Sequence, residues 1–189
     1  MKRTLLVIDF INEIVDPAGK LAAKGYAGFI ADHETLAHLN DAIGAFRRSE
    51  DSVVFVRLAF DPSYADQPKE SPIFGQAHNF GILADGIWST EINNAVDYRK
   101  DDEVVTKTRV SAFHGTDLAE TLRNRGVTDV YIAGVATDLA VEAAARSAHD
   151  NDFKVSVVTD ACAAASQADH DKSMHVLPKF AQLVTASEL

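Results

Sequence analysis

The sequence is poor in basic residues and in cysteine. Its 18 lysines and arginines stand against 28 aspartates and glutamates, which gives a net charge of −10. Proteins that bind nucleic acid or a membrane surface need a basic face, so this balance argues against both kinds of partner. A single cysteine excludes an internal disulfide, and the lack of Cys-x-x-Cys pairs removes the usual zinc-binding patterns.

Long apolar runs are also missing. No run approaches the roughly 20 residues needed to cross a lipid bilayer. The first apolar run is interrupted at Asp9, too early for a secretory signal peptide, and we therefore expect a cytoplasmic protein. With 47% hydrophobic residues, the chain can form one full core, and we expect a single domain over residues 1–189.

Segments typical of strands and helices alternate along the chain. Apolar, β-branched runs predict strands at 4–8, 52–58, 103–108, 129–135, 154–159 and 181–185. Helical spacing of apolar residues predicts helices at 32–48, 116–125, 138–149 and about 168–177. Thr116 is the expected N-cap of the second helix, and Gly126 its end. This alternation predicts an α/β fold, with a mostly parallel sheet covered by helices on both sides.

One connection, 59–102, is much longer than an ordinary crossover between strands. A long loop inside a compact domain is usually functional. Because it leaves the carboxyl end of the second strand, we expect it to form the wall and lid of a pocket there. The alternative is a loop that packs on the side of the domain or against a second subunit.

Polar side chains stand where strands of the predicted sheet end. Asp9 closes the first strand and Lys107 closes the third, while the segment 136–140 follows the fourth. The carboxyl ends of parallel strands share one edge, so these three elements can converge. A neighbouring carboxylate and ammonium group can share proton transfers, although such a pair can equally be a structural salt bridge or a helix cap.

The segment Asp129–Ala145 predicts a buried strand that turns directly into a helix. Such a turn points the first unpaired N–H groups of the helix at whatever lies above the sheet edge, which suits an anion or an oxyanion. The turn is built like the site of a nucleophile, yet Ala140 stands on it.

Four segments together resemble the isochorismatase-like hydrolases, also called the cysteine hydrolase family: VIDFIN, TKTRVSAFHGTDL, IAGVATDLAVEAAARSA and VVTDACAAAS. This resemblance runs nearly end to end. It implies a Rossmann-like three-layer α/β/α fold with a six-stranded, mostly parallel sheet. It also implies a small-molecule substrate, and a homodimer or homotetramer in which neighbouring subunits help to close the pocket.

The amidases of that family hydrolyse small amides with a triad of Asp, Lys and Cys. By resemblance, Asp9 and Lys107 match the first two residues, and Ala140 stands where the nucleophilic cysteine is found. The peptide between Val135 and Ala136 matches a position that is often cis, and turns the N–H groups of Ala136 and Ala140 toward the substrate oxygen. A methyl group cannot attack a carbonyl, so this chain cannot form the thioester of those amidases.

Three functions remain open. True isochorismatases of that family also lack the cysteine and use the Asp as a general acid. By resemblance, Asp9 would protonate a vinyl ether, and water would capture the oxocarbenium ion that results. Alternatively, the protein is a cysteine-dependent amidase inactivated by Ala140, or a non-catalytic scaffold that binds ligands or assembles into oligomers. Cys162 is not an expected substitute, because an isolated cysteine among alanines is usually a small buried hydrophobe.

Candidate substrate-binding residues are few. Arg57 and Arg109 could bind carboxylates, which would suit a small anionic substrate, or could pair with structural carboxylates. Phe80 and Trp88, on the long connection, could pack on a substrate ring or fill the core.

No cofactor and no catalytic metal is expected. The nicotinamidases of that family bind a metal through an Asp-x-His pattern after the second strand, and this chain departs from them. Here Asp61 is followed by Pro62 and Ser63. His170 and His175 lack the four-residue spacing of a two-histidine helical site.

Overall fold

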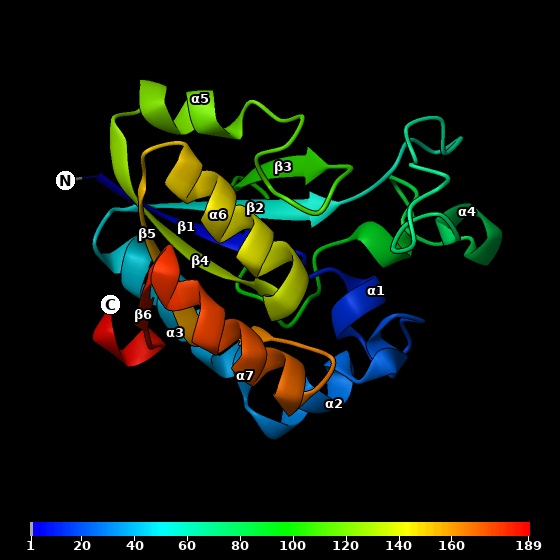
Figure 1. Cartoon of the computed structure of the whole chain (residues 1–189), viewed down its shortest axis with the longest axis horizontal. Coiled ribbons are helices and arrows are strands. Elements are labelled where there is room, and N and C mark those ends of the chain that lie inside the picture. Colours follow the sequence, from blue (N-terminus) through cyan, green and yellow to red (C-terminus); the bar gives the residue numbers. More distant parts are fainter. Residues whose placement is uncertain (1) are drawn as a thin grey trace.

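A computed structural model describes residues 2–189, in which six strands form one fully parallel sheet (Figure 1). The strands are β1 (Lys2–Ile8), β2 (Ser52–Leu58), β3 (Glu103–Lys107), β4 (Val127–Val135), β5 (Lys154–Ala163) and β6 (Gln182–Val184). Their order across the sheet is β3-β2-β1-β4-β5-β6, and every neighbouring pair is parallel. The predicted six-stranded sheet is confirmed.

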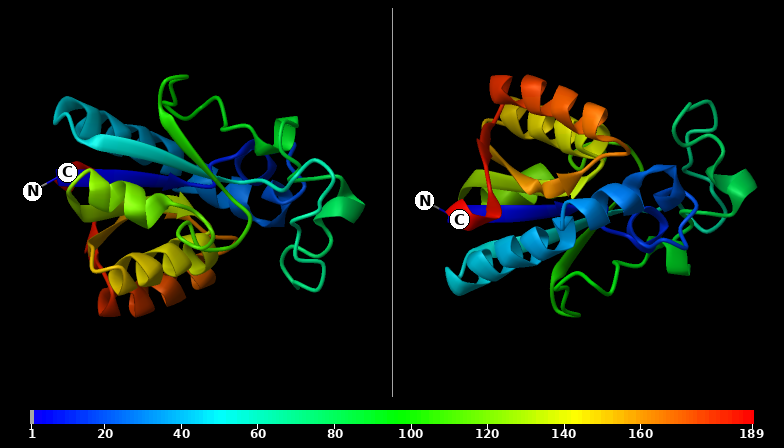
Figure 2. Two further views of the ribbon diagram at one scale, coloured as in Figure 1. Left: turned by 90° about the horizontal axis from the view of Figure 1, so that it is seen from above. Right: turned by 90° about the horizontal axis from the view of Figure 1, so that it is seen from below.

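Helices cover both faces of this sheet (Figure 2). They are α1 (Asn12–Val15), α2 (Tyr26–Asp32), α3 (Thr35–Arg48), α4 (Ala77–Phe80), α5 (Leu118–Asn124), α6 (Glu142–Asp150) and α7 (Gln167–Val176). Apolar residues of α2 and α3 pack in one core, and those of α5, α6 and α7 in a second core across the sheet. The three-layer α/β/α arrangement is therefore confirmed. No helix of residues 2–189 is long and apolar enough to cross a membrane.

The first strand shows why the sequence selects this arrangement. Leu5 and Val7 belong to the core on the side of α3, whereas Leu6 and Ile8 belong to the core on the side of α6. Side chains alternate across a strand, so a strand buried on both faces needs apolar residues at successive positions. The uninterrupted apolar run at 4–8 meets this requirement.

Two helices differ from their predicted form. The segment 32–48 is divided, because Glu34 adopts a left-handed conformation (φ 50°) between α2 and α3. The segment 138–149 begins with a wider π-type turn, Thr137–Val141, before α6 starts at Glu142. In that turn the Val141 N–H donates to the Ala136 carbonyl oxygen at 3.1 Å.

The predicted N-cap at Thr116 is wrong. The Thr116 hydroxyl donates to the Ala112 carbonyl oxygen at 2.7 Å, so it is engaged in the preceding turn, and Asp117 occupies the N-cap position of α5. The prediction at the other end holds: Gly126 follows the helix with φ 74°, a left-handed conformation that glycine adopts without steric cost.

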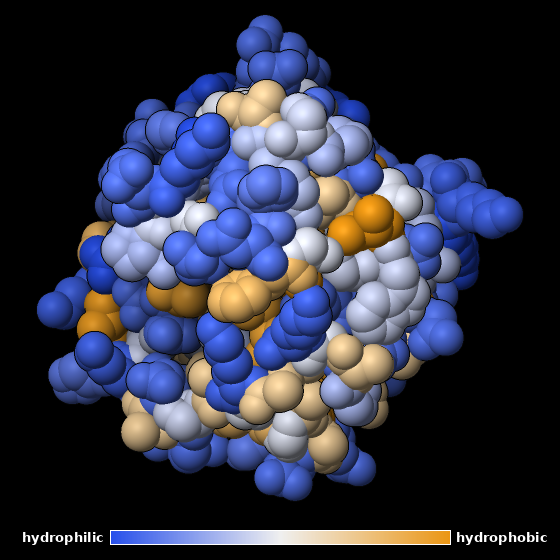
Figure 3. Space-filling model, turned by 90° about the vertical axis from the view of Figure 1, so that its right-hand side faces the viewer, coloured by the Kyte–Doolittle hydropathy of each residue, from blue (hydrophilic) through white to orange (hydrophobic). Residues whose placement is uncertain are grey.

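From β1 the chain adds β2 and β3 on one side of the sheet and then β4, β5 and β6 on the other, so the strand order reverses between β1 and β4. The carboxyl ends of the strands at such a reversal frame a binding crevice. The long connection 59–102 lies beyond this end of the sheet (Figure 1). Backbone bridges hold it there, between Phe60 and Ala84 and between Ile11 and Ile92. Figure 3 shows this face, on which apolar residues lie among a mainly hydrophilic surface.

Two glycines near α2 provide a matched test of this fold. At Gly25 (φ 115°) an added Cβ would lie 2.1 Å from the Ala165 carbonyl oxygen, whereas at Gly28 it would meet no atom within 4 Å. We expect Gly25→Ala to lower the free energy of unfolding by about 2 kcal/mol or more. Gly28→Ala should raise it by up to about 1 kcal/mol, because alanine favours the helix. Urea unfolding measures both, and equal effects would contradict the close packing at Gly25.

Candidate active site

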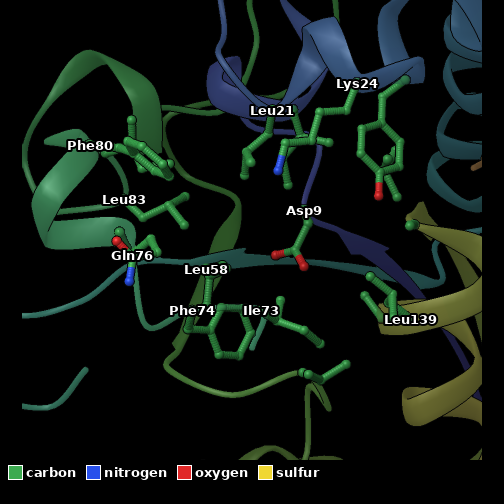
Figure 4. A pocket seen from close by; sticks show the side chains of 18 of the residues that line it. Asp9, Leu21, Lys24, Leu58, Ile73, Phe74, Gln76, Phe80, Leu83 and Leu139 are labelled. Atoms are coloured by element: carbon green, nitrogen blue, oxygen red, sulfur yellow. The ribbon is translucent and has the colours of Figure 1, made fainter. Parts of the chain in front are cut away.

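A cavity of about 360 Å³ opens at the carboxyl end of the sheet (Figure 4). The ends of β1, β3 and β4 contribute Asp9, Lys107, Val135 and Ala136. The long connection contributes a largely apolar side, which comprises Pro72, Ile73, Phe74, Gln76, Ala77, Phe80, Ile82 and Leu83. The connection therefore forms a wall of the cavity, as its length and position predicted.

Asp9 is directed into the cavity by an unusual backbone conformation. It follows β1 with φ 59°, and its N–H donates to the Val56 carbonyl oxygen at 2.8 Å. Left-handed conformations are uncommon outside glycine, are tolerated best by Asn and Asp, and tend to occur at functional sites. The carboxyl group points into the cavity in Figure 4, although the residue is only 3% exposed.

Lys107 reaches Asp9 from the edge strand of the sheet. As the last residue of β3 it pairs in register with Leu58 of β2. Its Nζ lies 2.7 Å from Asp9 Oδ2 and donates to the Val110 carbonyl oxygen at 2.8 Å. Within the described chain, Asp9 Oδ1 has no hydrogen-bond partner. One carboxyl oxygen is thus held by the ammonium group, and the other is available to a ligand.

Burial and the ion pair act on Asp9 in opposite directions. Removal of the carboxyl from water raises its pKa, while the neighbouring Lys107 ammonium lowers it, and burial is the larger effect. The pKa of Asp9 is therefore raised above its ordinary value of 3.8. A carboxyl of this kind is protonated more readily than an exposed one, as a general acid requires.

The turn after β4 brings backbone and a methyl group to the same cavity. The peptide between Val135 and Ala136 is cis, and both residues line the cavity together with Ala140. Gly134 lets this turn approach the first strand, since an added Cβ would lie 3.0 Å from Ile8 Cβ. Ala140 is 4% exposed and presents no nucleophile. The predicted use of the Ala136 and Ala140 N–H groups as an oxyanion site stays a prediction.

Cys162 lies outside the cavity lining and is 1% exposed. Its thiol donates to the Val158 carbonyl oxygen at 3.2 Å. Burial raises the pKa of this thiol to about 12, which leaves it protonated at neutral pH. These properties fit the small buried hydrophobe that the sequence indicated.

Three of the predicted substrate-binding residues do not line the cavity. Arg57 pairs with Asp85 at 2.7 Å, and Arg109 donates to the Thr108 carbonyl oxygen at 2.7 Å. Trp88, which begins a 3₁₀ turn of the long connection, is 45% exposed. Arg57 thus pairs with a carboxylate, the alternative that the sequence left open, whereas Arg109 is bonded to backbone carbonyl oxygens. Of the four predicted residues, the cavity lining includes Phe80.

The cavity also contains residues that sequence reasoning missed. Lys24, Tyr26 and Gln76 line it, together with Leu21 and Leu139. Lys24 lies in the turn before α2 and Tyr26 is the first residue of α2, both away from any strand end in the sequence, so no motif or spacing marked them. Burial raises the pKa of Tyr26, which leaves a neutral phenol as a potential hydrogen-bond donor.

Metal ligands are not grouped in the described structure. Within residues 2–189, no three His, Cys, Asp or Glu side chains lie together as a potential metal site. The Asp61 carboxylate instead accepts a hydrogen bond from the Ser63 N–H at 2.8 Å. Catalysis without a metal or another cofactor remains a prediction.

The ion pair between Asp9 and Lys107 should affect the free energy of unfolding and its dependence on pH. We expect Lys107→Met to lower the free energy of unfolding by about 3 to 5 kcal/mol, because Asp9 then has no counter-ion. The folded-state pKa of Asp9, already raised, should rise further. A carboxyl group whose pKa is raised by folding contributes no loss of stability below its pKa in the unfolded chain, about 3.9. As pH rises from there through the folded-state pKa, the folded protein loses stability. The variant should therefore lose more stability at pH 9 than near pH 4.

Urea unfolding at both pH values measures this difference. The double variant Asp9→Asn/Lys107→Met is the control, because it has no ionisable group at either position. It should show no added dependence on pH. A Lys107→Met variant with equal losses near pH 4 and at pH 9 would contradict the raised pKa of Asp9.

Comparisons with known proteins give the family of this chain. The isochorismatase domain matches residues 3–188. The isochorismatase family protein YecD of Escherichia coli O157:H7 is 30% identical over 94% of this chain and 82% of its own length. The ureidoacrylate amidohydrolase RutB of Methylobacterium radiotolerans is 28% identical, over 83% of this chain and 65% of its own length.

Solved structures agree with these matches. A cysteine hydrolase from Pseudomonas syringae pv. phaseolicola superimposes with a TM-score of 0.88 at 25% identity, over 99% of this chain and 90% of that one. The N-carbamoylsarcosine amidase of Thermoplasma acidophilum gives a TM-score of 0.77 at 27% identity, over 100% and 99% of the two chains. The chain therefore belongs to the isochorismatase family of hydrolases.

Proposed function

We propose that this protein hydrolyses a small anionic metabolite without a cysteine nucleophile, using Asp9 as the general acid. The observation that carries this proposal is the state of the Asp9 carboxyl. It is buried at the base of a cavity, its pKa is raised, and Oδ1 has no partner within the described chain. No thiol lines the cavity within residues 2–189, so the reaction must be one that needs no thiolate.

Hydrolysis of a vinyl ether, the reaction of isochorismatases, meets this requirement. Asp9 gives its proton to the terminal methylene carbon, and the electron pair of the double bond forms the new C–H bond. The oxocarbenium ion that results is captured by water, which returns a proton to the Asp9 carboxylate. The hemiketal then separates into a ketone and an alcohol.

Lys107 has a defined role in this sequence of steps. Proton donation leaves Asp9 as a buried carboxylate, and the Lys107 ammonium at 2.7 Å stabilises that charge as it forms. The same ammonium lowers the pKa of Asp9, but burial raises that pKa by more. Ala140 leaves space beside the acid for the body of a substrate.

A second candidate is a cysteine-dependent amidase in which Ala140 is an inactivating substitution. It is favoured by the position of Ala140, which lines the cavity with Asp9 and Lys107, and by the amidohydrolase names of several relatives. A third candidate is a non-catalytic scaffold. The homodimer or homotetramer that the resemblance implies is compatible with all three and stays a prediction.

Removal of the acid tests the main proposal. We expect Asp9→Asn to reduce the hydrolysis of small vinyl ether carboxylates at least about 100-fold, because an amide cannot supply the proton. Wild-type kcat should fall as pH rises through the raised pKa of Asp9. Asp61→Asn, which changes an exposed aspartate outside the cavity lining, should behave as the wild type. A folded wild type that hydrolyses no vinyl ether would overturn the proposal and favour the scaffold.

Ala140→Cys separates the first two candidates. We expect this variant to hydrolyse vinyl ethers more slowly, because a larger side chain fills a 4% exposed position, and to gain no amidase activity. Ala140→Ser is the control, as it has nearly the same size without a thiol. A screen of small amides and ureido acids, with mass spectrometry for a thioester, provides the measurement. Amide turnover by Ala140→Cys and not by Ala140→Ser would support the amidase instead.

A further inference from the structure

The charged side chains that line the cavity differ in balance from the chain as a whole. Acidic residues outnumber basic ones by 28 to 18 over the full sequence. Among the described residues that line the cavity, the charged ones are Asp9, Lys24 and Lys107. Two ammonium groups therefore stand against one carboxyl group in this lining. The cavity is therefore a cationic site in an acidic protein, which favours an anionic ligand.

The two lysines are not equivalent. Lys107 is 2% exposed, and its ammonium is engaged by Asp9 and by the Val110 carbonyl oxygen. Lys24 is exposed, and no carboxylate of residues 2–189 lies within ion-pair distance of it. Figure 4 shows its side chain extending from the turn before α2 into the cavity. Lys24 is thus the cation that remains for a ligand.

The turn that carries Lys24 is fixed by its neighbours. It forms a short 3₁₀ helix, η1 (Ala22–Lys24), in which the Lys24 N–H donates to the Leu21 carbonyl oxygen at 2.9 Å. The Leu21 N–H donates to the buried Glu13 carboxylate at 3.0 Å. On the other side, Gly25 packs directly against the Ala165 backbone. The Lys24 backbone is therefore held in place, and less order is lost when its side chain binds a ligand.

The lining of the cavity around Lys24 and Asp9 is mostly apolar. In Figure 4, Leu21 lies beside Lys24, while Phe74, Phe80 and Leu139 line other sides of the cavity. A second anionic group on the ligand would find no free ammonium group among the described lining residues, because Lys107 is paired with Asp9. The surroundings suit a ligand with one anionic end, an apolar body and a reactive group at the other end.

We propose that Lys24 binds the carboxylate of the substrate at the mouth of the cavity, and that the substrate is an amphiphilic monoanion. This inference deepens the proposed function, and it rests on that function for the reaction at Asp9. Lys24 orients the substrate so that its apolar body lies along the cavity wall. The hydrolysable group then reaches the Asp9 carboxyl.

Binding of two unreactive probes tests this inference. Benzoate and nitrobenzene have nearly the same shape, but only benzoate carries a charge. We expect wild type to bind benzoate more tightly than nitrobenzene in isothermal titration. Lys24→Met should weaken benzoate about tenfold and leave nitrobenzene unchanged, because it removes the cation and keeps most of the apolar stem. Lys24→Arg should restore benzoate binding, and added salt should weaken it in wild type more than in Lys24→Met.

Lys100→Met is the matched control. This exposed lysine lies before β3, at the opposite end of the strands from the cavity, and its loss should leave both affinities unchanged. The inference is overturned if wild type does not prefer benzoate, if Lys24→Met binds it as wild type does, or if that variant weakens both probes equally. Neither probe is hydrolysed, so these outcomes do not depend on the acid chemistry. Asp9→Asn should abolish turnover and retain the preference for benzoate.

Discussion

The ion pair between Asp9 and Lys107 joins the ends of two strands that are not neighbours in the sheet. Their side chains are 4% and 1% exposed, so the protein holds both charges almost away from water. Such an arrangement is costly unless the geometry is good, and here the ammonium gains a second acceptor in the Val110 carbonyl oxygen. The carboxyl retains an oxygen without a partner among the described residues. A pair built only for stability would satisfy both oxygens.

The sheet order places this pair where a ligand can reach it. With the order β3-β2-β1-β4-β5-β6, Asp9 and the turn at Ala136 lie on either side of the point where the direction of growth reverses. The long connection then completes a mainly apolar wall around them. Low polarity strengthens electrostatic interactions inside the cavity, and it is also what raises the pKa of Asp9. The apolar cavity wall and the raised pKa of Asp9 are therefore linked by the same burial.

Ala140 separates this chain from the thiol chemistry that its resemblance to amidases implies. The position lies in the cavity beside the acid and the ammonium group, and the remaining thiol, Cys162, is sealed in the core with its pKa raised to about 12. Family membership supplies the scaffold, but the local side chains select the reaction. An acid that donates a proton to carbon needs no nucleophilic side chain, and it fits the residues present.

The sequence by itself determined the α/β fold, since apolar runs such as 4–8 have the pattern that a sheet buried on both faces demands. It also determined that Asp9, Lys107 and Ala140 share one edge, because parallel strands end together. Only the tertiary structure decided the surroundings of those groups. Burial, which no local pattern encodes, raises the pKa of Asp9, and contacts across the fold engage Arg57 and Arg109 elsewhere. Lys24 enters the cavity from a turn without a motif, because only packing brings α2 beside the strand ends.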